Sequence, residues 1–250
     1  MDYVKGYIVV SIVNLLLVDV LCVDKERGKK YMEKYFEDTK ENREWFESFV
    51  KSDEFSEALG IVWKYGKERW TYFTIGNKKR EIVSRFVEIV KGTSPMRANF
   101  IKQDNYTQWC CNMNLKHPFL IKIKEMGWTP RMEQEREYPK GEFHHAVFIK
   151  TYIRICHEVG TMRKKTRKGI KVTCARLRIH GSKDMLQHIN KHLHDALGIS
   201  LKKLQTDTSS NRVKVLYYQS QKDIPVILKY IGAKESLEKF NSFNLGDIEN

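Results

Sequence analysis

Apolar and polar positions form two patterns along this chain, and each pattern occurs twice in the same order. Residues 69–92, RWTYFTIGNKKREIVSRFVEIVKG, begin with strict alternation, which predicts a strand. A polar turn and an amphipathic helix follow, and the helix ends near Gly92. Residues 174–198 repeat this sequence of patterns, with Gly198 in the place of Gly92. The chain therefore contains an internal repeat.

The repeat extends on both sides of these segments. Residues 106–127 and 212–232 each predict a strand followed by a short helix that ends at a Gly. Apolar helices are expected ahead of each copy, at 54–66 and 144–160. One copy could not cover both faces of its sheet, whereas two copies packed through their first helices could. We therefore expect an α+β fold of two pseudo-symmetric αββαββα repeats, each with an antiparallel sheet, and four segments: an N-terminal extension 1–53, a first repeat 54–143, a second repeat 144–232 and a C-terminal tail 233–250.

Composition adds a polyanionic partner to this expectation. The 250 residues carry a formal net charge of +14, which favours nucleic acid or an anionic surface. Five cysteines in no zinc or redox spacing suggest reduced, buried thiols in an intracellular protein. We expect a cytoplasmic location, with association to the nucleoid when the polyanionic partner is DNA. His188 and His192 share a helix face, but no further ligand stands at zinc-site spacing, so we expect no metal site there.

The stretch 7–23, YIVVSIVNLLLVDVLCV, is strongly apolar. It has 17 residues and includes Asp19, whereas a membrane-spanning helix needs about 20 apolar residues. We expect a buried helix or strand and no membrane partner. The alternative is a membrane-associated or protein-interaction module that uses this stretch as its anchor.

Two short motifs and the segment between them carry a family resemblance. Residues 59–66 read LGIVWKYG, and residues 148–153 read FIKTYI. In residues 120–152 a helix ends at Gly, a basic turn follows, and a Pro-containing stretch leads into the second motif helix. With the double repeat, this pattern resembles the LAGLIDADG homing endonucleases in their single-chain, two-repeat form. The resemblance implies that the two motif helices pack together, that each ends in an acid followed by Gly, and that the acids hold a divalent metal at the cleavage centre. It also implies that the strands lie in the major groove of double-stranded DNA.

The expected acids are not where the resemblance places them. Tyr65 precedes Gly66 in the first copy, and an ungapped match puts Cys156 at the acid position of the second. A small insertion would instead bring Glu158 near the site, as the one candidate catalytic residue, although a solvated acid at a helix end has the same appearance. Because the second acid is missing, we expect a sequence-specific, cleavage-deficient binder of double-stranded DNA with a regulatory role, without a cofactor and not an enzyme. The resemblance allows this role, since some members of the superfamily act as transcription regulators. The alternative is an active, Mg²⁺-dependent endonuclease.

Strand alternation and one basic hairpin indicate the DNA-binding residues. In residues 171–180, apolar Ala175, Leu177 and Ile179 should face the helices, so the residues between them face outward. The hairpin 163–171 has six basic residues and no acid, which suits phosphate contacts. The predicted DNA-binding residues are Trp70, Tyr72, Thr74, Gln108, Asn112, Arg163, Lys164, Lys165, Arg167, Lys168, Lys171, Arg176, Arg178, His180, Arg212, Lys214 and Tyr218. Two repeats in one chain can bind a DNA site with pseudo-twofold symmetry, so we expect a monomer. We expect no small-molecule substrate.

Overall fold

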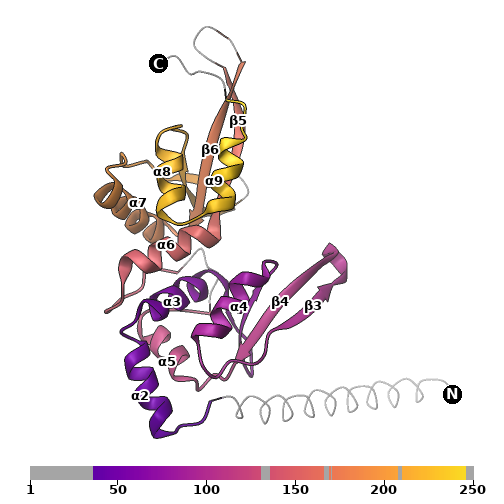
Figure 1. The fold of residues 1–250 in the computed structure, drawn as a ribbon, viewed down its shortest axis with the longest axis vertical. Coiled ribbons are helices and arrows are strands. Elements are labelled where there is room, and N and C mark those ends of the chain that lie inside the picture. Colours follow the sequence, from indigo (N-terminus) through magenta and orange to yellow (C-terminus); the bar gives the residue numbers. More distant parts are fainter. Residues whose placement is uncertain (1–35, 131–135, 166–168, 170, 208–209, 246–250) are drawn as a thin grey trace, which may run out of the picture. The chain divides into compact units, whose positions relative to one another are not determined.

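The structure is a computed structural model that describes residues 36–130, 136–165, 169, 171–207 and 210–245 (Figure 1). It divides into two compact units. Residues 67–121, with the described residues before Glu47, form the first unit, and residues 47–66, with those after Ile121, form the second. The apolar stretch 7–23 lies outside the described residues. Within the described part, no helix is long and apolar enough to cross a membrane.

The elements follow the predicted double order. After α2 (Lys40–Phe49), the first copy runs α3 (Asp53–Tyr65), β1 (Gly66–Glu68), β2 (Phe73–Asn77), α4 (Arg80–Ile89), β3 (Arg97–Ile101), the 3₁₀ helix η1 (Lys102–Asp104), β4 (Tyr106–Met113) and α5 (Pro118–Glu125). The second copy runs α6 (His145–Cys156), β5 (His157–Lys165), β6 (Lys171–Gly181), α7 (Lys183–Leu197), β7 (Gln205–Asp207), β8 (Ser210–Tyr218) and α8 (Asp223–Tyr230), and α9 (Lys234–Asn241) follows. The αββαββα order is thus confirmed in both copies. The segment boundaries stay a prediction.

Each copy builds one four-stranded sheet, and both sheets have the same strand order. Sheet A is β1-β2-β4-β3 and sheet B is β5-β6-β8-β7. The pairs β2–β4, β3–β4, β5–β6, β6–β8 and β7–β8 are antiparallel. In sheet A, Thr74 stands opposite Asn112, and in sheet B, Arg178 stands opposite Tyr217. These registers decide which side chains share the face that the helices leave uncovered, which we call the open face of each sheet.

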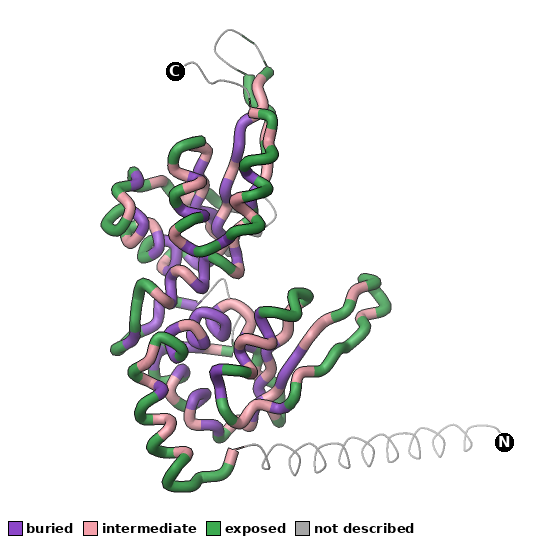
Figure 2. The backbone as a smooth tube through the Cα atoms, viewed as in Figure 1, coloured by how far each residue is buried: buried purple, intermediate pink, exposed green. Residues whose placement is uncertain are grey.

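The core of the first unit lies between α4 and sheet A. Helix α4 places Val83 and Phe86 on the face that contacts β2 and β4, and both residues are fully buried. Phe73 and Ile75 of β2 meet them from the sheet, as strand alternation requires. The turn between β3 and β4 is exposed, as Figure 2 shows in green.

The second unit is built around the pair of helices α3 and α6. Ser52 begins α3 by accepting a hydrogen bond from the backbone N–H of Phe55. Gly60 lets the helices approach closely, since a Cβ at this position would lie 3.1 Å from the Cβ of Thr151. Trp63 and Phe148 pack edge to face, with ring centroids 6.2 Å apart. The predicted packing of the first helices against each other is therefore confirmed.

The second motif helix is shorter than the sequence predicted. We expected a helix over 144–160 that ends at Gly160, but α6 ends at Cys156 and β5 begins at His157. The ring of His157 explains the sharp end, because Nδ1 bonds to the carbonyl oxygen of Ile153 at 2.9 Å and Nε2 to Ser236 Oγ at 2.7 Å. The end of α6 agrees with the ungapped match, which places Cys156 at the end of the motif helix. Glu158 belongs to a strand.

The four described cysteines agree with the prediction of buried thiols. Cys110, Cys111, Cys156 and Cys174 are all buried and none forms a disulfide. Burial raises the pKa of Cys111 to about 12, so this thiol stays protonated and unreactive at neutral pH.

Candidate nucleic-acid interface

The paired helices α3 and α6 end without a carboxylate. The last residue of α3 is Tyr65, whose hydroxyl donates a 2.8 Å hydrogen bond to the carbonyl oxygen of Ile155 in α6. The last residue of α6 is Cys156, which is buried. A strand follows directly in both cases. The two positions where the family resemblance expects metal-binding acids therefore hold a phenol and a thiol.

A buried arginine occupies the C-terminal end of α3. Arg136 is only 4% exposed, and its guanidinium donates to the carbonyl oxygens of Trp63 at 2.5 Å, Gly66 at 2.9 Å and Thr129 at 3.1 Å. It also lies 4.8 Å from the ring of Trp128. A cation at this helix end complements the helix dipole, and it uses the carbonyl oxygens that could otherwise face a metal.

Arg136 was missed by the sequence analysis, because its role depends on burial against a helix about 70 residues away. Its positive charge would repel a divalent cation beside Tyr65. Across the described residues, no group of three or more His, Cys, Asp or Glu side chains could hold a metal ion. The residues at the helix ends thus do not fit Mg²⁺.

Glu158 does not lie at a helix end, so the expectation that α6 continues to Gly160 and carries this acid near its end was wrong. It is the second residue of β5, and its carboxylate lies on the open face of sheet B. The Nη2 atom of Arg178 donates to its Oε2 at 2.5 Å, and the Nη2 atom of Arg176 lies 3.6 Å from its Oε1. A carboxylate between two guanidinium groups is already neutralised and is a poor ligand for a hard cation.

The open face of sheet B contains part of the predicted set. Arg176, Arg178 and His180 alternate with the buried Ala175, Leu177 and Ile179, as predicted. Toward the end of β5, Arg163, Lys164 and Lys165 are exposed, and Lys165 pairs with the exposed Lys171 of β6. Arg167 and Lys168 lie outside the described residues. Arg212 is in β8, but its side chain is outside the description as well.

The prediction for β8 was wrong in its alternation. Tyr218 stands opposite Leu177 and Leu216 opposite Ile179, so both face the helices and are fully buried. The outward residues are Val215 and Tyr217. Lys214 shares the inward side with Tyr218 and donates to Thr206 Oγ1 at 3.0 Å. Residues 215–218, VLYY, are all apolar or aromatic, so the sequence does not show which alternate positions face the helices.

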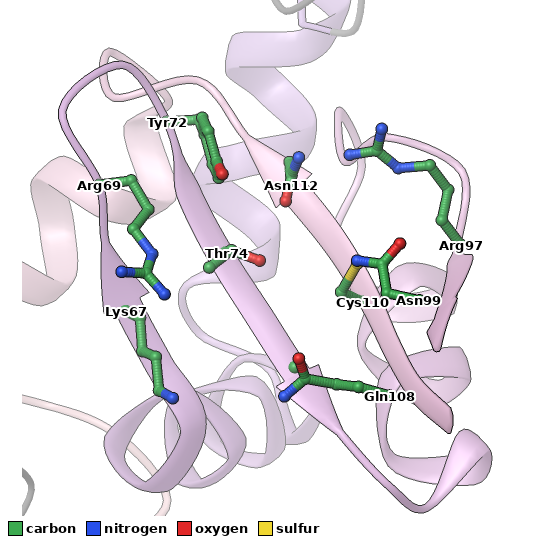
Figure 3. Close-up of a pocket in the computed structure, with 10 residues that line it drawn as sticks. Lys67, Arg69, Tyr72, Thr74, Arg97, Asn99, Gln108, Cys110 and Asn112 are labelled. Atoms are coloured by element: carbon green, nitrogen blue, oxygen red, sulfur yellow. The ribbon is translucent and has the colours of Figure 1, made fainter. Parts of the chain in front are cut away.

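The open face of sheet A forms a polar hollow of about 150 Å³ (Figure 3). Three of its lining residues are cations, Lys67, Arg69 and Arg97, and none is an acid. The lining residues come from β1 to β4 and from the turn before β2: Lys67, Arg69, Tyr72, Thr74, Gly76, Arg97, Asn99, Gln108, Cys110 and Asn112. Tyr72, Thr74, Gln108 and Asn112 were predicted here. Lys67, Arg69, Arg97 and Asn99 were missed, because β1 was not recognised as a strand and β3 was not assigned an outward face.

Hydrogen bonds fix the middle of this hollow. Thr74 donates from Oγ1 to the carbonyl oxygen of Cys111 at 3.1 Å. With the Asn112 amide turned so that both ends are satisfied, its nitrogen donates to Thr74 Oγ1 at 2.9 Å and its oxygen accepts from Arg97 Nη2 at 2.6 Å. Asn99 lies beside Cys110, with 3.2 Å between Nδ2 and Sγ. Arg97 is thereby held toward the open face.

Trp70 was predicted to lie in a strand, and this was wrong. It lies in the turn between β1 and β2. A backbone hydrogen bond from Arg69 N–H to the carbonyl oxygen of Tyr72, at 2.8 Å, closes this turn. The indole of Trp70 is 95% exposed. A large aromatic side chain thus projects into solvent directly beside one of the cations of the hollow.

These features define a class of fold: two copies of αββαββα, paired through their first helices, each with a sheet that has one open face. This is a LAGLIDADG-like fold. The homing endonuclease I-WcaI, solved bound to its DNA recognition sequence, matches with a TM-score of 0.53 and 11% identity, over 84% of this chain and 97% of that chain.

Two further solved structures show weaker similarity. The LAGLIDADG meganuclease I-AabMI, bound to uncleaved DNA, matches with a TM-score of 0.49 and 12% identity, over 76% of this chain and 89% of that one. The N-terminal LAGLIDADG domain of DUF199/WhiA gives 0.46 and 16%, over the same shares of the two chains. No family model matches the sequence, and no curated protein matches it significantly.

Proposed function

We propose that this protein binds double-stranded DNA sequence-specifically through the open faces of its two sheets and does not cleave it. The observation that carries the proposal is the hollow of sheet A, where three cations and several amide and hydroxyl groups share one uncovered face without an acid. The similar fold of I-WcaI, which was solved bound to its DNA recognition sequence, supports double-stranded DNA as the partner.

The chemistry of the hollow matches what a duplex presents. Lys67, Arg69 and Arg97 can neutralise phosphates or donate to guanine, while Gln108 and Asn112 can pair with adenine. A strand ribbon is narrow enough to enter the major groove. The net charge of +14 over the whole chain supplies the long-range attraction.

The absence of cleavage is proposed from the ends of α3 and α6. Phosphodiester hydrolysis by a bound metal requires carboxylates to hold the cation. Tyr65 and Cys156 stand at the two helix ends, Arg136 adds a buried positive charge, and Glu158 is neutralised by two arginines. A regulatory role, expected from the sequence, follows from binding without cleavage and remains part of this proposal.

Fluorescence anisotropy with a labelled random-sequence duplex tests the binding. Arg69→Ala combined with Arg97→Ala removes two cations from the hollow. Arg43→Ala combined with Arg85→Ala removes an exposed arginine of α2 and a partly exposed arginine of α4 as a charge-matched control. We expect the first pair to weaken binding about tenfold or more and to lower the slope of log K against log [salt] by about 1 to 2. Equal effects of both pairs would refute the assignment of the face.

A cleavage assay tests the second half of the proposal. A supercoiled plasmid library that carries random inserts is incubated with the protein and with Mg²⁺ or Mn²⁺, and we expect no nicked or linear product. Cleavage that Glu158→Gln abolishes would establish the alternative, an active endonuclease. Cleavage that survives this substitution would show that other residues hold the metal.

A further inference from the structure

The open faces of the two sheets differ in one respect: sheet B contains an acid and the hollow of sheet A does not. Glu158 pairs with Arg178 at 2.5 Å and lies 3.6 Å from Arg176. The side chains are 47%, 29% and 30% exposed, respectively. All three can therefore be reached by a ligand on this face while they remain in contact with one another.

The backbone register explains how one carboxylate reaches two guanidinium groups. Glu158 stands directly opposite Arg178 in the β5–β6 pair, so these two side chains are cross-strand neighbours. Arg176 stands opposite Gly160, where a Cβ atom would lie 3.5 Å from Arg176 Nε. The missing side chain leaves room for Arg176 to lie across β5 toward Glu158.

Nothing else among the described residues is seen to fix the two guanidinium groups. The Nε atoms of Arg176 and Arg178 are buried and have no hydrogen-bond partner there. The polar contacts of both groups run from Nη2 to the carboxylate of Glu158. Without Glu158, each arginine would regain the rotamer freedom of a long side chain.

We propose that Glu158 is a positioning residue for base recognition: it fixes Arg176 and Arg178 so that they select guanine in the half of the DNA site read by sheet B. This rests on the proposed DNA binding. A fixed guanidinium can donate to O6 and N7 of one guanine, whereas a free one also accepts any nearby phosphate. The carboxylate repels phosphates, so it lowers the affinity for every DNA sequence. By fixing the arginines it also increases the difference in affinity between sequences with and without guanine at these positions.

The experiment is a selection from a duplex pool with a randomised core. Wild type, Glu158→Gln and Glu158→Ala are compared with Glu142→Ala, which removes an exposed acid away from sheet B as the charge-matched control. We expect wild type and the control to enrich guanine at one or two positions that both Glu158 variants lose, with a preference at least about fivefold weaker. Arg176→Ala and Arg178→Ala should lose the same positions. Affinity for a fixed random-sequence duplex at low salt should rise several-fold in the Glu158 variants.

Three results separate this inference from the function on which it rests. If the Glu158 variants select the same bases as wild type, the positioning role is wrong and DNA binding stands. If they lose every preference and their thermal unfolding midpoint falls well below that of the control, Glu158 is only structural and the inference is overturned. If wild type binds no duplex at all, the proposed function fails, and the inference fails with it.

Discussion

Arg136 allows a quantitative test of how the end of α3 is stabilised. We consider Arg136→Met, which keeps much of the apolar stem and removes the guanidinium, and Arg136→Lys, which keeps the charge. The guanidinium makes four hydrogen bonds of 2.5 to 3.4 Å to carbonyl oxygens and lies over Trp128. Neither replacement can span four carbonyl oxygens that point to it from two segments of the chain.

The expected cost follows from the partners that remain behind. A hydrogen bond to a charged group contributes about 1.5 to 3 kcal/mol, but the four bonds of one group are not additive. Removal of one side of a buried charged contact costs about 3 to 5 kcal/mol, because the other side stays buried and unsatisfied. We expect Arg136→Met to lose about 3 to 5 kcal/mol of unfolding free energy and Arg136→Lys somewhat less, a large fraction of the stability of an ordinary domain.

Urea denaturation followed by circular dichroism measures this loss, and Arg154→Met serves as control. Arg154 is a partly exposed arginine of α6, paired with Glu57 at 2.9 Å, and its loss should cost no more than about 1 kcal/mol. If Arg136→Met unfolds within 1 kcal/mol of wild type, the carbonyl oxygens of α3 find other partners. The view that this buried cation closes the helix end would then be refuted.

Three further predictions concern packing, pH and the exposed aromatic residue. Gly60→Val should destabilise the protein by about 1 to 3 kcal/mol in urea denaturation, because the valine side chain would overlap Thr151. Thr151→Ala in the same chain should recover part of this loss, and losses that simply add would contradict the overlap. Burial lowers the pKa of His117 to about 4, so the unfolded chain binds more protons between pH 6.5 and 4, and the unfolding free energy should fall by about 3 kcal/mol on acidification through this window. His117→Gln should flatten the dependence of the unfolding free energy on pH between about 6.5 and 4. An unchanged slope would show that other groups cause the loss of stability. Addition of duplex DNA should quench the emission of the exposed Trp70, and Trp70→Phe should remove this quench; a quench that persists would exclude contact at this turn.

Most of the fold was predictable because its signals are local and occur twice. The alternation of β2 and β6, the amphipathic spacing of α4 and α7, and the glycines that end helices are written in short windows of sequence. Gly198, for example, adopts a positive φ of 67° and ends α7 as predicted. Repetition mattered as much, since each weak signal in one copy supported its equivalent in the other.

The parts that failed depend on contacts between distant segments. The end of α6 is set by His157 bonding to Ser236, and the facing of β8 is set by its register against β6. Neither can be read from a window of neighbouring residues. For the site, the open face of β6 and four residues of the hollow were predictable from alternation, whereas Lys67, Arg97 and the buried Arg136 needed the fold.

The place of α3 in the second unit limits how this protein can be divided. Residues 47–66 precede the first sheet in sequence, yet they pack on α6 through Trp63 and Phe148. A fragment that starts at residue 122 would therefore expose the apolar side of α6 to water and should aggregate. Chimaeras that exchange one half for a relative's, or split versions reassembled from two polypeptides, should keep α3 together with α6 and make the cut elsewhere.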